Sequence, residues 1–173
     1  MNVQGSTPSK SSKGAGRGLA VALLVVGLVI GLGVGYLVAP SPQAPPAPGN
    51  VIETSGSSVH LAVLSGPGLA FTIGGLEDPT VQVDQGANVT VYLRNIDNMP
   101  HSFVIVAQAP PYGADPAGAA FPGAETPMAM DGTMPGENAT ASFTASTAGT
   151  YYYVCHVPGH AAGGMYGRFE VRA

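Results

Sequence analysis

Positive charge is scarce in this chain of 173 residues, and lysine is absent after Lys13. Beyond residue 50 the basic side chains are Arg94, Arg168 and Arg172, whereas all ten carboxylates lie there, so this part has a formal charge of −7. Nucleic-acid binding needs lysine and arginine clustered on one surface. The sequence therefore excludes a nucleic-acid partner.

Long hydrophobic runs are also lacking, with one exception at residues 19–39, which contain no charged side chain. As a helix this run would reach about 31 Å, the thickness of a bilayer's hydrocarbon core. Lys10, Lys13 and Arg17 precede it and nothing basic follows before Arg94, so the positive-inside rule leaves the N-terminus in the cytoplasm. A cleaved signal peptide is the alternative, but its apolar region would be shorter, about 7–15 residues. We therefore expect a single-pass anchor in the cell membrane, with all later residues outside.

Composition divides the chain into four segments. Residues 1–18 are rich in serine, glycine and lysine and should form a disordered cytoplasmic tail before the anchor. Residues 40–50 are dense in proline, which predicts an extended linker. Residues 51–173 are long enough for one folded domain.

Three glycines in the anchor, Gly27, Gly31 and Gly35, follow one another at four-residue spacing. Small residues at this spacing let two membrane helices approach closely. Weak self-association through this face is therefore a hypothesis, although glycine is also common in membrane anchors for no such reason.

The outer segment shows no helical period from Val59 onward, but short β-branched and aromatic runs separated by turn residues. Val89, Val91 and Leu93 alternate with polar residues, which predicts a strand with one buried face. We expect strands at residues 59–64, 69–73, 80–83, 88–95, 101–108, 140–145, 150–155 and 166–171. Such a series is typical of an all-β Greek-key sandwich or barrel.

The single cysteine, Cys155, opens the segment CHVPGHAAGGM, which also contains His160 and Met165. A thiolate, an imidazole and a thioether thus share one loop between two expected strands. Blue copper sites combine two histidine nitrogens and a cysteine sulfur with a weak axial methionine. His101, at the start of an earlier expected strand, is the candidate for the second imidazole.

These residues resemble a known family. The stretch GTYYYVCHVPGHAAGGMYG at residues 149–167, together with His101-Ser-Phe, is similar to the cupredoxins, the type 1 blue copper proteins, and within them to the sulfocyanins and rusticyanin. The similarity covers about residues 85–173. It implies a cupredoxin-like sandwich with one copper that cycles between Cu(I) and Cu(II). The ligands that it implies are His101, Cys155, His160 and Met165.

The resemblance also implies how electrons reach the copper. They would enter and leave near His160, whose ring edge lies close to an apolar surface patch in this family. The candidates for this patch are Pro100, Val157, Pro158 and Ala161. The function expected is transfer of single electrons between respiratory-chain components, without enzymatic activity, and the expected partners are a terminal oxidase and a cytochrome or Rieske-type donor in the membrane.

Two other functions deserve comparison. A copper oxidoreductase needs further histidines, and only His60, expected to be structural, and His156, expected to be exposed, remain. A binuclear copper site of the oxidase type would need a second cysteine, which the sequence lacks. A copper delivery or storage module stays open as the alternative.

The segment at residues 109–138 bears on that alternative. It is rich in alanine, proline and glycine and contains Met128, Met130 and Met134. We expect an ordered insertion over one end of the sandwich, in which the methionines fill apolar gaps. A soft contact surface or a second copper(I) site is the other interpretation.

Overall fold

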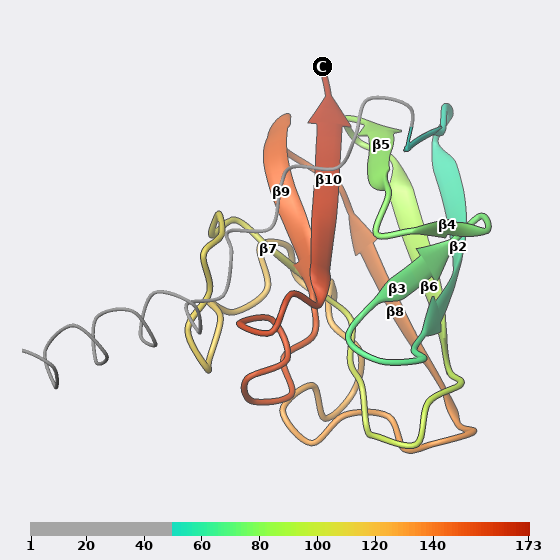
Figure 1. The fold of residues 1–173 in the computed structure, drawn as a ribbon. Coiled ribbons are helices and arrows are strands. Elements are labelled where there is room, and N and C mark those ends of the chain that lie inside the picture. Colours follow the sequence, from blue (N-terminus) through green and yellow to red (C-terminus); the bar gives the residue numbers. More distant parts are fainter. Residues whose placement is uncertain (1–49) are drawn as a thin grey trace, which may run out of the picture. The chain divides into compact units, whose positions relative to one another are not determined.

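The computed structural model describes residues 50–173, and this part of the chain is a β-sandwich of two five-stranded sheets (Figure 1). The first sheet has the order β1 (Val51–Glu53), β5 (Thr80–Asp84), β10 (Tyr166–Arg172), β9 (Gly149–Val154) and β7 (Val104–Val106). The second has the order β4 (Leu76–Glu77), β3 (Phe71–Ile73), β2 (Ser58–Ser65), β6 (Asn88–Asn95) and β8 (Asn138–Thr144). The all-β prediction is confirmed.

The predicted tail and anchor, and all of the predicted linker except residue 50, lie outside the described residues. From residue 50 onward, no helix is long and apolar enough to cross a membrane.

The eight strands predicted from sequence are present, with changes at their ends. The strand predicted at 101–108 is reduced to β7, because His101 forms only an isolated bridge with Thr133. Two short strands, β1 with three residues and β4 with two, were not predicted. In β6 the expected alternation is confirmed, since Val91 is buried and Tyr92 is 50% exposed.

An aromatic cluster fills the centre of the sandwich. The ring of Tyr153 in β9 stacks on Phe103 at 5.4 Å, and Phe71 of the other sheet meets both rings edge-on at 5.5–5.6 Å. Each such side chain contributes about 1.5–3 kcal/mol by leaving water. The Tyr153 hydroxyl also donates a hydrogen bond to the carbonyl of Pro79 at 2.6 Å. The two sheets are thereby held together directly beneath the segments that carry the predicted ligands.

The insertion between β7 and β8 joins the edge strands of the two sheets. Its backbone is hydrogen-bonded to β7. The Ala120 N–H donates to the carbonyl of Ile105, and the Ile105 N–H donates to the carbonyl of Ala124. Phe121 enters the core and stacks on Phe143 of β8 at 5.6 Å. Residues 119–126 therefore run along the β7 edge and close the gap between the sheets, whereas Gly132 and Thr133 of the insertion lie against Val157 and His101 at the ligand end of the sandwich.

The expectation that the insertion's methionines fill apolar gaps is wrong. Met128 is 71% exposed, Met130 48% and Met134 53%. The insertion buries Tyr112, Phe121 and alanines instead, so its packing leaves the longer thioether side chains in solvent.

Candidate metal centre

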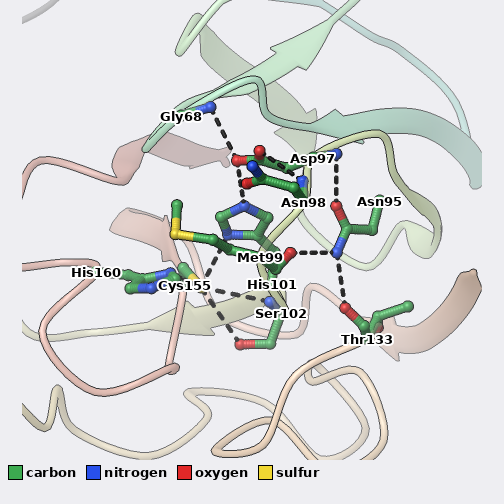
Figure 2. A network of polar contacts seen from close by, with 10 residues as sticks. All are labelled: Gly68, Asn95, Asp97, Asn98, Met99, His101, Ser102, Thr133, Cys155 and His160. Carbon is green, nitrogen blue, oxygen red and sulfur yellow. Dashed lines mark hydrogen bonds and ion pairs between the residues drawn. The ribbon is translucent and has the colours of Figure 1, made fainter. Parts of the chain in front are cut away.

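The structure brings His101, Cys155 and His160 together, as the sequence predicted. Their donor atoms all lie within 4.8 Å of one another. The Cys155 Sγ atom is 3.9 Å from Nδ1 of His101 and 3.5 Å from Nδ1 of His160 (Figure 2). Ligands bound at about 2.0–2.3 Å in a trigonal plane are about 3.5–4 Å apart. The two sulfur–nitrogen distances thus match those between ligands of one metal ion.

The loop between β9 and β10 carries Cys155, His160 and Met165. The Cys155 N–H donates to the Met165 carbonyl at 3.1 Å, which closes the base of the loop where the two strands pair. Inside the loop, the N–H of His160 donates to Val157 and the N–H of Met165 donates to His160, each at 3.0 Å. Met165 is fully buried. These bonds fix the loop and hold its two sulfur-bearing residues side by side at its base.

His101 reaches the same place from a different segment. Its N–H donates to the Thr133 carbonyl at 3.1 Å, and its carbonyl accepts the Thr133 N–H at 2.6 Å, so the insertion holds its backbone on both sides. Its side chain is fully buried. Phe103, two residues on, faces the same core as Cys155, as the strand alternation predicted.

The environment of Cys155 suits a metal-bound thiolate and not a free nucleophile. Burial raises the pKa of its thiol, while the N–H of Ser102, 3.4 Å from the sulfur, acts in the opposite direction. A buried thiol of raised pKa is unreactive unless a metal ion displaces its proton. One soft sulfur beside two imidazoles is the donor set that copper takes in type 1 sites. The residues present therefore fit copper.

His160 is the ligand nearest the surface. Burial, and then the neighbouring His101, lower the pKa of its ring, which favours the neutral imidazole that metals bind. Of the four residues expected in the apolar patch around it, Pro158 is exposed and Pro100 and Val157 are half-buried. Ala161 is only 1% exposed and packs into the interior, so its assignment to the patch is wrong.

The two remaining histidines lie outside this cluster. His156 was expected to be exposed, but it is 6% exposed, with Nε2 2.9 Å from the carbonyl of Ala117. The insertion covers it, which the local sequence could not indicate. His60 is an exposed residue of β2 that stacks on Tyr92 at 6.0 Å.

Sequence reasoning missed Asp97. Its Oδ2 atom is 3.0 Å from Nε2 of His101, on the side of the ring away from Cys155 (Figure 2). The hydrogen bond from His101, followed by that from the Asn98 N–H, lowers the pKa of Asp97. The available signal was a carboxylate four residues before a predicted ligand, inside a turn-forming segment.

Comparison with known proteins gives the same result. Residues 68–172 match the model of the copper binding proteins of the plastocyanin/azurin family. The chain is 38% identical over 136 residues to rusticyanin of Acidithiobacillus ferrooxidans, an alignment that covers 72% of this chain and 68% of the relative. Rusticyanin of Acidithiobacillus ferridurans gives the same identity and coverage.

Solved structures agree with the sequence comparison. Reduced rusticyanin matches with a TM-score of 0.61 and 34% identity, over 74% of this chain and 88% of that one. Rusticyanin from Thiobacillus ferrooxidans matches with the same score and identity, over 74% and 86%. This chain therefore belongs to the plastocyanin/azurin family of copper-binding proteins, as a cupredoxin similar to rusticyanin whose cofactor is one type 1 copper.

Proposed function

We propose that this cupredoxin carries single electrons between respiratory-chain components on the outer face of the membrane. His101, Cys155 and His160, with Met165 beside them in the ligand loop, would hold its copper. The observation that carries the proposal is the convergence of three donors, from two separate segments, within 4.8 Å of one another, with His101 and Cys155 fully buried. When bound, the copper supplies a one-electron couple between Cu(I) and Cu(II).

The protein's part is to hold the ligands still and keep water out. His101 is bonded to the insertion on both sides, and the ligand loop is closed at its base by the bond from Cys155 to Met165. Ligands held in this way would stay in place if the charge of a bound metal changed, which would keep the reorganisation energy low. His160, half-buried beside exposed Pro158, is the route for electrons.

The surroundings of the ligands favour a carrier over an enzyme. His101, Cys155 and Met165 are each fully buried, so a substrate has no path to the copper through them. The one other histidine near the loop, His156, is turned to the carbonyl of Ala117. Within residues 50–173, His60 and His156 belong to no second cluster of three metal-binding side chains, so a further copper of the kind that multicopper enzymes use has no site there.

Membrane attachment is part of the proposal and rests on the sequence of residues 19–39. A domain tethered by the proline-rich linker at 40–50 meets membrane partners at high effective concentration and need not bind them tightly. We propose a terminal oxidase as acceptor and a cytochrome or Rieske-type protein as donor. Sedimentation of the full chain with membranes, and its release only by detergent, would support the anchor. Release by salt alone would oppose it.

Copper delivery is the second candidate, because Met128, Met130 and Met134 expose soft thioethers to solvent. The two functions differ in how firmly copper is held. A carrier keeps one copper per chain against a chelator, whereas a delivery protein loses its copper rapidly or binds more than one.

The test is an absorption and EPR spectrum of the full chain, purified in detergent and loaded with copper. We expect an intense thiolate-to-copper band, one copper per chain, reversible one-electron reduction and no turnover of nitrite or phenols. Cys155→Ser should abolish the band. His60→Asn, which changes an exposed histidine outside the site, should leave it unchanged. A Cys155→Ser protein that kept the band would refute the assignment of the thiolate.

A further inference from the structure

We propose that Asp97 is a positioning residue for the copper centre: its carboxylate fixes His101 with Nδ1 toward Cys155, and its negative charge favours the oxidised copper. This inference rests on the proposed function. By this inference, the carboxylate of Asp97 lowers the redox potential of the site.

The contact between the carboxylate and the ring decides which nitrogen can bind metal. A neutral imidazole has one N–H and one free lone pair. With Nε2 3.0 Å from Oδ2 of Asp97, the proton belongs on Nε2, because a carboxylate only accepts. Nδ1 is then the lone-pair nitrogen, and it lies 3.9 Å from the sulfur of Cys155. Figure 2 shows the ring of His101 between the carboxylate and the sulfur.

The carboxylate of Asp97 is itself held by backbone donors. The N–H of Gly68 donates to Oδ2 at 2.9 Å, and the N–H of Asn98 donates to Oδ1 at 2.7 Å. The side chain of Asp97 is only 9% exposed. Three N–H groups, counting that of His101, thus converge on one anion, which is how a protein keeps a carboxylate charged and oriented.

A single buried asparagine connects this carboxylate to the backbone of His101. Asn95 accepts the Asp97 N–H through Oδ1 at 2.9 Å, and its Nδ2 donates to Met99 at 2.7 Å and to Thr133 at 2.8 Å. Thr133 is the residue that bridges His101. The turn that carries Asp97 and the backbone that carries His101 therefore belong to one hydrogen-bonded frame, which sets the distance between them.

The loop after β2 is shaped to lie against Asp97. Gly66 has φ +88°, and a Cβ atom there would be 2.5 Å from Cβ of Asp97. Gly68, whose N–H holds the carboxylate, has φ +78°. Glycine is the residue that takes such angles without strain and leaves room for close approach. The sequence Gly66-Pro-Gly68 thus supplies the space and the donor that Asp97 needs.

The charge of Asp97 is not neutralised by a fixed cation. Within residues 50–173 the only ion-pair partner within 4.0 Å of its carboxylate is His101. An anion one imidazole ring away from a metal interacts more favourably with Cu(II) than with Cu(I), because the oxidised ion has the greater positive charge. Removal of the Asp97 charge should therefore raise the midpoint potential, so that more of the protein is reduced at a given potential.

The test is the midpoint potential of copper-loaded full chain carrying Asp97→Asn. Asparagine keeps one oxygen that can accept from His101 but has no charge. We expect the blue band to persist and the ratio of reduced to oxidised protein at a fixed potential to rise about tenfold, which is about 59 mV for one electron. Glu53→Gln is the matched control, since it removes one exposed carboxylate from β1 and should leave the potential unchanged.

The outcomes separate this inference from the proposed function. A blue Asp97→Asn protein whose potential equals that of Glu53→Gln would overturn the inference and leave the carrier function standing. A wild-type chain without a blue band would overturn the carrier function first. If Asp97→Asn fails to load copper, nitrogen-15 NMR of the wild-type Cu(I) protein decides. We expect an Nε2–H proton on His101 that the hydrogen bond to the Asp97 carboxylate shifts downfield and protects from exchange with solvent, and an Nε2–H with the shift and exchange rate of an exposed imidazole would refute the contact.

Discussion

The backbone N–H of Ser102 points at the sulfur of Cys155 across 3.4 Å. The hydroxyl of Ser102 lies 3.8 Å from the same sulfur and accepts the N–H of His156 at 2.9 Å. Ser102, which follows the predicted ligand His101, thus holds the backbone of His156, which follows the predicted ligand Cys155. Because of this contact, the segment of His101 and the loop of Cys155 cannot move independently.

Replacing Ser102 by alanine should affect both stability and potential. The buried N–H of His156 would lose its acceptor, which costs about 1–3 kcal/mol of unfolding free energy. The sulfur would lose its hydroxyl neighbour and become a stronger donor to Cu(II), so the potential should fall.

Urea unfolding and voltammetry measure these two effects of Ser102→Ala. Ser142→Ala is the control, because the Ser142 hydroxyl makes an exposed bond to Thr90 at 3.4 Å. If the Ser102 variant matched this control in both measurements, the hydroxyl would have no role at the site.

The ring of Tyr153 gives a second prediction, on stability alone. Tyr153→Phe keeps the aromatic packing with Phe71 and Phe103 but leaves the carbonyl of Pro79 without its donor. We expect a loss of about 1–3 kcal/mol in unfolding free energy, measured by urea denaturation. Tyr92→Phe, at a site that is 50% exposed, should change it by less than about 0.5 kcal/mol. Equal effects of the two substitutions would contradict the assigned hydrogen bond.

Three of the predicted copper ligands could be recognised from the sequence because they lie at short spacings in one segment. Cys155, His160 and Met165 occupy one loop, and a loop between paired strands has few ways to close. His101 required a further argument, from strand alternation and the need for a second imidazole. The structure brings it to the cysteine and to His160, and Phe103, two residues after it, shares one core with Cys155.

What the sequence did not predict depends on contacts between distant segments. Asp97 accepts a hydrogen bond from the N–H of Gly68, which belongs to the loop after β2. No local sequence pattern predicts this contact. His156 is buried because the carbonyl of Ala117, far away in the chain, reaches it. Met128 lies in the insertion and is 71% exposed. Each case needs the path of a long loop, which composition and periodicity do not determine.

Exposure predicts the order in which the methionines oxidise. Met128, Met130 and Met134 are 48–71% exposed, whereas Met165 is fully buried. Hydrogen peroxide should convert these three thioethers to sulfoxides first and then Met99, which is 37% exposed, while Met165 remains intact, because oxidation follows access. Peptide mass spectrometry over a time course measures each site. Oxidation of Met165 at the rate of Met128, in the copper-free chain, would mean that the ligand loop opens in solution.

The titration of Asp78 makes the free energy of unfolding depend on pH. Burial raises the pKa of Asp78 from its ordinary value of 3.8 to about 7; the hydrogen bond from the Phe71 N–H opposes this rise, and the charge of Glu77 adds to it. The folded state therefore binds this proton more tightly than the unfolded state does. The resulting stability is fully present below about pH 4 and is lost as the pH rises through 7, by at most about 4 kcal/mol.

Asp78→Asn isolates this effect, because asparagine keeps the acceptor for the Phe71 N–H and tolerates the φ of +42° found here. The difference in unfolding free energy between the variant and the wild type should be small at pH 4 and should grow in favour of the variant toward pH 8. Carboxylates of lowered pKa, such as Asp84, act in the opposite direction in both proteins and cancel in the difference. A difference that stays constant from pH 4 to pH 8 would show that Asp78 titrates in the folded state as it does in the unfolded chain.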